Sequence, residues 1–442
     1  MSEGQIRFGD TLDVPLRNGI YKPKQFHGQG AKIVNMGELF AHPRMRDVPM
    51  RRLEMSDKEL TKASLQNGDL IFARRSLTAE GAGKCSIVLE VNEPTTFESS
   101  IIRARLDQEN HSPLFYYYFF NSPQGKAALG SILRQVAVAG ITGKDLQELV
   151  VPVVPPADQS RIAEMLGSLD DKIELNRRMN ETLEEMARAL FRDWFVDFGP
   201  TRRQIEGATD PAAIMGHAFP PEKAATLAPL FPAKLGDDGL PEGWNEQSVS
   251  ELTLLLKRGA APKYAETGCL VVNQKCIRNN TINYNLARRN DLSLRDPKLK
   301  ELQVGDVLVN STGVGTLGRV ATVRTLPDRA MADTHISIVR PDPDIIEPAI
   351  VALLLETLQG QIADMGHGST GQTELKPSAI GEIHAVISGR EVQEAFGTVV
   401  GALRSKVDAN QQENQTLAEM RDLLLPKLMS GEIRLKDVEA VR

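Results

Sequence analysis

The chain has little cysteine and no long apolar run. Its 442 residues include three cysteines, Cys85, Cys269 and Cys276, which form no closely spaced pair. Zinc sites and disulfide frameworks need such pairs, so we expect three reduced thiols in the core and no metal. No stretch of eighteen apolar residues occurs, and the first residues lack the basic-then-apolar pattern of a signal peptide. The sequence therefore predicts a cytoplasmic protein without a membrane-spanning helix.

Motifs of catalysis are missing as well. The sequence contains no H-E-x-x-H or G-x-S-x-G motif and no [DN]-P-P-[FYW] tetrapeptide, the usual mark of an amino-methyltransferase. GVGTLG at 313–318 matches G-x-G-x-x-G, but strand-like segments flank it on both sides. A dinucleotide site needs a helix after the glycines. We therefore interpret this segment as a turn and expect no catalytic centre in the chain.

The excess of acidic residues, 58 against 52 basic ones, argues against a nucleic-acid partner, but the charges are unevenly distributed. The segment 22–75 holds 11 Lys or Arg against 6 Asp or Glu, and 257–329 holds 13 against 6. Between them, 158–197 holds 6 basic against 10 acidic residues. Distribution matters more than the sum for binding, so two basic blocks remain compatible with nucleic acid. A solvated surface would explain such blocks equally well.

One phrase occurs twice, 234 residues apart: ELNRRMNETLEEM at 174–186 and DANQQENQTLAEM at 408–420. At the same offset Gln159 corresponds to Gln393. Upstream, LQNGDLIF (65–72) matches LQVGDVLV (302–309), and LRNG (16–19) matches LKRG (256–259). A chain of this length exceeds one hydrophobic core. The pattern therefore indicates a duplication of about half the chain.

Each half ends in a segment whose apolar residues recur every three or four positions, which predicts a long helix with a coiled-coil seam. Asparagines occupy the middle of both seams, at Asn176, Asn180, Asn410 and Asn414. A buried Asn opposite Leu leaves an amide unpaired, so such residues fix register at a cost in stability. We expect an antiparallel pair in which Asn faces Asn; two separate surface helices with exposed asparagines are the alternative. Pro426 should end or kink the second helix.

The expected fold class is α+β: two similar mixed α/β domains joined by two long helices paired as an antiparallel coiled coil, in a pseudo-twofold arrangement. The expected boundaries are a first domain at 1–156, a first long helix at 157–198, a Pro-, Gly- and Ala-rich linker at 199–242, a second domain at 243–390, a second long helix at 391–430 and a C-terminal tail at 431–442.

Two basic, loop-rich domains without a catalytic motif favour recognition of DNA. Arg74 and Arg75 directly follow the strand-like GDLIF, and Asn310, Ser311 and Thr312 follow its counterpart GDVLV. Arg can read guanine and Asn adenine, whereas Ser and Thr are adaptable. Arg319 is a further DNA-binding candidate. Candidates for phosphate contacts are Lys22, Lys24, Arg44, Arg46, Lys257, Arg258, Lys263, Lys275 and Arg278.

Four segments resemble one family. Residues 155–198 resemble its conserved central region, LLLPKLMSGEI (423–433) its C-terminal signature, LPEGW (240–244) the start of its second recognition domain, and STGVGTLGRV (311–320) a recurring turn. The chain thus resembles the specificity (S) subunit of type I restriction–modification systems over nearly its whole length. It departs from the pattern where the N-terminus lacks a PEGW-like start and where SGREVQEAF replaces a Pro-rich opening of the second helix.

The resemblance implies that each target recognition domain reads one half of a bipartite, asymmetric site in double-stranded DNA. Two methyltransferase (M) subunits would dock on the helices, and two restriction (R) subunits would join them. S-adenosylmethionine would bind to the M subunits, ATP and Mg to the R subunits, and no cofactor to this chain. The residues expected to dock partners are Leu190, Phe191, Trp194, Leu424 and Leu428. A coiled-coil scaffold for proteins, and a specificity subunit of a methylation-only or phage-defence complex, remain alternatives.

Overall fold

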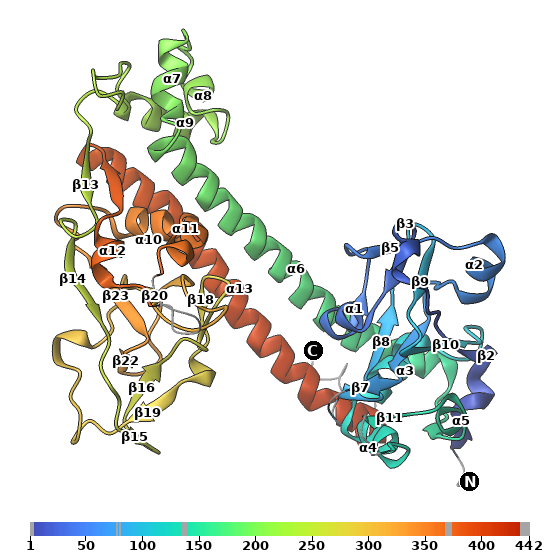
Figure 1. Ribbon diagram of the computed structural model, residues 1–442. Helices are drawn as coiled ribbons and strands as arrows, with labels where there is room; N and C mark the ends of the chain where they lie inside the picture. Colours follow the sequence, from blue (N-terminus) through green and yellow to red (C-terminus); the bar gives the residue numbers. More distant parts are fainter. Residues whose placement is uncertain (1–3, 77, 79–80, 135–138, 367–373, 434–442) are drawn as a thin grey trace. The chain divides into compact units, whose positions relative to one another are not determined.

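The computed structural model describes residues 4–76, 78, 81–134, 139–366 and 374–433. The chain divides into two compact units (Figure 1). The first comprises residues 1–177 and 411–442, and the second comprises residues 178–410. Each unit contains one mixed α/β domain and a part of both long helices. The expected fold class, two α/β domains joined by paired long helices, is therefore confirmed.

The first domain contains a five-stranded sheet and a three-stranded sheet. The larger sheet has the order β2 (Leu12–Asn18), β10 (Ile101–Leu106), β6 (Leu70–Ala73), β8 (Cys85–Val88) and β4 (Arg44–Met45). The smaller has the order β5 (Arg51–Leu53), β3 (His27–Val34) and β9 (Thr95–Phe97). Two further pairs are β1 (Gln5–Arg7) with β12 (Val150–Pro152) and β7 (Arg75–Ser76) with β11 (Ala139–Gly140). The helices are α1 (Met36–Ala41), α2 (Asp57–Ala63), α3 (Pro113–Asn121), α4 (Pro123–Ser131) and α5 (Gly143–Gln147).

The second domain repeats this plan. One sheet has the order β14 (Thr253–Arg258), β23 (Ile336–Pro341), β20 (Val307–Asn310) and β21 (Val320–Thr322). The other has the order β15 (Tyr264–Ala265), β19 (Arg288–Asn290), β16 (Cys269–Val272) and β22 (Ala330–Ala332). Two further pairs are β13 (Asn245–Ser248) with β24 (His384–Ile387) and β17 (Ile277–Arg278) with β18 (Thr281–Ile282). The helices are α10 (Pro348–Thr357), α11 (Gln359–Asp364) and α12 (Pro377–Gly381).

The repeated sequence phrases form repeated contacts. Asp69 and Asp306, the last residues of LQNGD and LQVGD, are both buried. Each binds an arginine of the neighbouring strand, Arg105 or Arg340, at 2.7 Å. The glycines of LRNG and LKRG are also required, since a Cβ on Gly19 or Gly259 would collide with backbone carbonyl oxygens of the adjacent segment. The duplication inferred from the sequence is therefore a duplication of structure.

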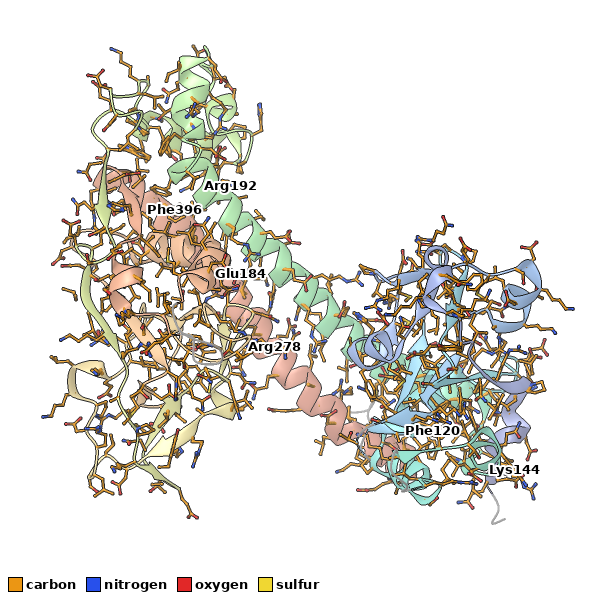
Figure 2. All side chains as sticks on the ribbon, in the orientation of Figure 1. Phe120, Lys144, Glu184, Arg192, Arg278 and Phe396 are labelled. Carbon is orange, nitrogen blue, oxygen red and sulfur yellow. The ribbon has the colours of Figure 1, made fainter. Side chains whose placement is uncertain are left out.

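The aromatic segment in α3 is core, as the sequence indicates. All six residues from Phe115 to Phe120 are buried. Phe120, which is labelled in Figure 2, packs edge-on against Phe8 and Phe72. The three cysteines are free and buried in hydrophobic clusters. GVGTLG forms the turn between the antiparallel strands β20 and β21, which confirms the predicted turn.

The long helices are α6 (Pro156–Phe195) and α13 (Arg390–Ser430). In the first unit the buried Gln159 side chain accepts a hydrogen bond from the Ser112 backbone N–H (2.8 Å) and donates one to the Val154 carbonyl (2.7 Å). In the second unit Gln393 does the same with Glu347 N–H (2.8 Å) and the Ser388 carbonyl (2.9 Å). One glutamine thus ties the start of each long helix to the start of α3 or α10.

The asparagines face one another as predicted. Within the first unit, the Asn176 amide donates to Oδ1 of Asn414 at 3.0 Å and to Oε2 of Glu413 at 2.7 Å. Within the second unit, the Asn410 amide donates to Oδ1 of Asn180 at 2.8 Å. Asn176 and Asn410 are almost completely buried, which excludes the alternative of exposed asparagines.

Two further features concern the end of the second long helix and the linker. Helix α13 continues through Pro426 for another turn, because Leu425, Leu428 and Met429 are buried in the core of the first unit. The segment 199–242, which the sequence analysis assigned to a linker, contains helices α7 (Gly199–Ile205), α8 (Pro211–Ile214) and α9 (Pro221–Leu227). Its Phe231 packs edge-on against Trp194 at a centroid distance of 4.9 Å. No helix in the described ranges could cross a membrane.

Candidate nucleic-acid interface

Two of the predicted phosphate ligands hold the first domain on its helix. Arg44 and Arg46, at β4 and just after it, both donate to Oδ1 of Asp171 on α6, at 3.0 and 2.8 Å. Because one carboxylate takes both guanidinium groups, neither is free for DNA. We therefore correct their assignment to a structural role.

The remaining candidates of the first domain differ in availability. Lys22 donates to Oε2 of Glu59 at 2.8 Å and to the Glu54 carbonyl at 2.9 Å, and Arg74 donates to the Ser99 carbonyl at 3.3 Å. The Lys22 ion pair holds the pKa of the Glu59 carboxyl at about 2. Lys24 and Arg75 are exposed. Arg75 lies on β7, shortly after β6 as the sequence predicted. The pairing of β7 with β11 fixes the Arg75 backbone.

In the second domain the segment after β20 is only partly accessible. Asn310 and Ser311 are fully buried. The Asn310 amide donates to the Gln274 carbonyl at 3.1 Å, and the Ser311 hydroxyl bonds that of Ser337 at 2.7 Å. Neither side chain can reach a base edge, so their assignment as base readers is corrected. The prediction failed because β20 lies in the interior of its sheet, between β23 and β21.

Thr312 and the turn that follows it remain accessible. The Thr312 hydroxyl bonds Nδ1 of His335 at 2.7 Å and donates to Oε1 of Gln274 at 3.2 Å. Arg319 closes the turn by donating to the carbonyls of Gly315 (2.9 Å) and Ile277 (3.3 Å). At the tip, Val314 is 92% exposed. The turn is therefore held by side-chain hydrogen bonds at its base and exposes an apolar residue at its tip.

The short hairpin β17–β18 lies against this turn, since the Asn280 amide donates to the Val320 carbonyl at 3.2 Å. Asn279 and Asn280 both have positive φ, 50° and 55°, which Asn tolerates better than other residues with a side chain. Arg278, labelled in Figure 2, precedes them and is exposed. Gln274, His335, Val314 and Asn279 are not among the predicted residues. The Asn279-Asn280 pair is a turn signal from which the hairpin could have been predicted.

Lys257, Lys263 and Lys275 of the second domain are exposed, whereas Arg258 is occupied. Arg258 donates to the carboxylate of Glu374 at 2.7 Å and to the carbonyls of Thr334 and Leu375 at 2.8 Å. Within the described ranges, six predicted cations are exposed and form no ion pair: Lys24, Arg75, Lys257, Lys263, Lys275 and Arg278. These exposed cations are the candidates for DNA contact that the structure leaves available. The described residues contain no metal-binding cluster of His, Cys, Asp or Glu.

The predicted docking residues are not on the surface. Leu190, Phe191 and Trp194 are buried in the core of the second unit. Leu428 is buried and Leu424 half-buried in the core of the first unit. They stabilise the chain itself, so their assignment to partner docking is wrong. The heptad pattern identifies seam positions but does not distinguish an internal partner from an external one.

Comparison with known proteins gives a consistent result. Residues 52–185 match the family described as type I restriction modification DNA specificity domain. The chain is 23% identical over 397 residues to the type I restriction enzyme MjaIX specificity subunit of Methanocaldococcus jannaschii, covering 87% of this chain and 84% of that protein. It is 27% identical over 334 residues to the HindI specificity subunit of Haemophilus influenzae, covering 66% and 71%.

The fold agrees with these sequence relationships. The crystal structure of a type I restriction–modification S subunit from M. genitalium superposes with a TM-score of 0.55 at 16% identity and covers 97% of both chains. The family domain lies on the first domain and the first part of α6, and the related sequences extend over both halves. The chain is therefore similar to the specificity subunits of type I restriction–modification systems, in sequence over most of its length and in fold.

Proposed function

We propose that this chain is the non-catalytic subunit that selects the DNA sequence for a type I DNA adenine methyltransferase and restriction complex. Each target recognition domain reads one half of a bipartite, asymmetric site. The chain acts in the cytoplasm, where the DNA lies, and supplies no reacting group.

One observation carries this proposal: the two domains share a framework but differ in the groups exposed on it. Asp69–Arg105 and Asp306–Arg340 are equivalent and structural. After the strand that each Asp precedes, the first domain presents Arg75 and the second presents Thr312 and Val314. A shared frame with different exposed chemistry is what two readers of two different half-sites require.

The partners follow from the family. Two M subunits bind S-adenosylmethionine and transfer its methyl group to an adenine flipped out of the duplex. Two R subunits use ATP and Mg for translocation and cleavage. These partners also contribute phosphate contacts, which makes a net charge of −6 on this chain compatible with DNA binding.

Genome-wide mapping of methylated adenines, with this gene present and deleted, tests the function. We expect one bipartite motif to lose methylation on deletion and to regain it on complementation. An unchanged methylome, with the M subunits present, would contradict the proposal. Methyl transfer from S-adenosylmethionine by the purified chain alone would contradict its non-catalytic role.

A further inference from the structure

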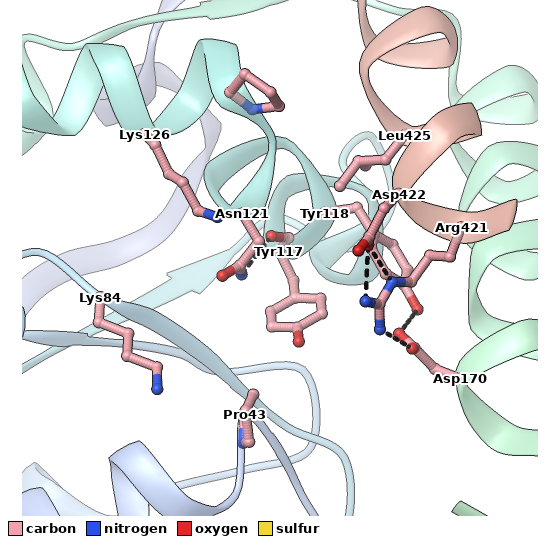
Figure 3. A pocket seen from close by; sticks show the side chains of 11 residues that line it. Pro43, Lys84, Tyr117, Tyr118, Asn121, Lys126, Asp170, Arg421, Asp422 and Leu425 are labelled. Carbon is pink, nitrogen blue, oxygen red and sulfur yellow. Dashed lines mark hydrogen bonds and ion pairs between the residues drawn. The ribbon is translucent and has the colours of Figure 1, made fainter. Parts of the chain in front are cut away.

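A cavity of about 360 Å³ lies within the first unit, between the α3–α4 corner and parts of both long helices (Figure 3). This volume is within the range of small-ligand sites, roughly 300–1,000 Å³. The cavity is lined by side chains of the first domain, among them Lys84, Tyr117 and Lys126, and by Asp170 of α6 and Arg421 of α13.

The Tyr117 hydroxyl points into this cavity without a partner. Tyr117 is 6% exposed, and no group in the described ranges forms a hydrogen bond with its hydroxyl. Its neighbour Tyr118, by contrast, donates to Oδ2 of Asp170 at 2.7 Å. The hydroxyl is a donor at the wall of the cavity, where a ligand with an acceptor can reach it.

The charges around the cavity favour an anion. The carboxylates of Asp170 and Asp422 are occupied by Arg421, each at 2.7 Å. Lys84 and Lys126 have no carboxylate partner among the described residues; Lys84 donates only to the Phe40 carbonyl, at 3.1 Å. Burial and the charge of Lys126 lower the pKa of Lys84. A negative group between the two lysines would relieve both effects.

The second unit has different side chains at the corresponding position. Counting from the first proline of α3 or α10, Tyr117 corresponds to Ala352 and Asn121 to Glu356. At the 234-residue offset Asp170 corresponds to Arg404, which forms a buried ion pair with Glu356 at 3.1 Å. The side chains that line the cavity in the first copy are therefore replaced by a buried ion pair in the second.

We propose that this cavity binds a phosphate group, with the Tyr117 hydroxyl and the ammonium groups of Lys84 and Lys126 as donors. A phosphate offers several strong acceptor oxygens to the donors that line the cavity, and such charge-assisted hydrogen bonds are strong. The group could come from a small phosphate monoester or from a nucleic-acid backbone, which share this chemistry.

Calorimetric titration of the full chain with inorganic phosphate and with AMP, at constant ionic strength, tests the proposal. We expect saturable binding of one ligand per chain, weakened about tenfold or more by Tyr117→Phe, Lys84→Met or Lys126→Met. Lys58→Met, at an exposed lysine of the same domain, is the matched control and should not change the affinity. Tyr117→Phe keeps the ring and so separates a lost contact from a folding defect.

A second arm identifies the source of the phosphate. AMP that stays bound when a short random duplex is added indicates a small monoester, and competitive displacement indicates a DNA backbone. No binding of either ligand, or equal affinities for wild type and all three cavity variants, would overturn the proposal. If phosphate does not bind but the complex still recognises its DNA sequence, only the phosphate proposal fails and the proposed function stands. The failure of one proposal can therefore be told from the failure of the other.

Discussion

The side-chain amide of Asn176 donates a hydrogen bond to Oδ1 of Asn414 across the helix pair of the first unit, at 3.0 Å. In this arrangement each amide has a polar partner in an apolar seam. A shift of either helix by one turn would place Asn opposite an apolar residue and leave the amide unsatisfied. The pair therefore specifies register rather than maximal stability.

A double-mutant cycle measures this coupling. Asn176→Leu alone leaves the Asn414 amide without its partner in a buried site, so the free energy of unfolding should fall by about 1–3 kcal/mol. Asn176→Leu with Asn414→Leu should recover the loss. Replacing Asn180 and Asn410 as well should raise the melting temperature yet allow slipped pairing. Spin labels at the exposed positions 168 and 419 would report slippage as a broadened distance distribution. A single sharp distance in the quadruple variant would contradict the register role.

The two glutamines that begin the long helices give a matched pair of tests. Gln159→Ala and Gln393→Ala each leave one backbone N–H and one backbone carbonyl, at least partly buried, without their side-chain partner, so each should destabilise by about 1–3 kcal/mol in urea unfolding. Gln412→Ala, at an exposed position of α13, should change stability by less than about 0.5 kcal/mol. Equal effects at all three positions would show that the contacts of Gln159 and Gln393 do not matter.

The periodic and repeated features could be predicted from the sequence. Which side chains are bound or buried by residues far away in the sequence could not. The asparagine layers, the duplicated domains and the aromatic core depend on local periodicity, which the sequence contains. The Arg44–Asp171 pair joins residues 127 positions apart. The burial of Asn310 depends on strands contributed by distant segments. Whether a surface cation is free depends on such contacts, and therefore the predicted interface was too large.

Arg75 and Arg44 should respond differently to truncation. Arg75→Ala should weaken binding of the assembled complex to its own site by about 1–3 kcal/mol if the guanidinium reads guanine. Arg44→Ala should leave the sequence preference unchanged and lower only the stability, because its partner is Asp171. Competition binding against substituted sites makes the measurement. An equal loss for Arg75→Ala on every sequence would instead assign Arg75 to a phosphate.

The Lys22–Glu59 pair predicts a pH dependence. Its folded pKa of about 2 is depressed below the ordinary Glu value of about 4.3. The pair therefore stabilises the fold at a pH above the ordinary Glu pKa. This stability is lost as the pH falls toward the pKa of Glu59 in the folded state. Carboxyl NMR titration should find Glu59 ionised at pH 4. In Lys22→Met the midpoint should move upward, because the first cause of the depression is removed. A normal Glu59 midpoint in the wild type would contradict the pair.

The central claim is that the two domains are independent readers of one bipartite site. Exchanging residues 1–156 for those of a related specificity subunit, and mapping methylated adenines with the same M subunits, tests it most directly. The account predicts that one half of the methylated motif changes while the other half keeps its bases. A change in both halves, or in neither, in an active complex would contradict it.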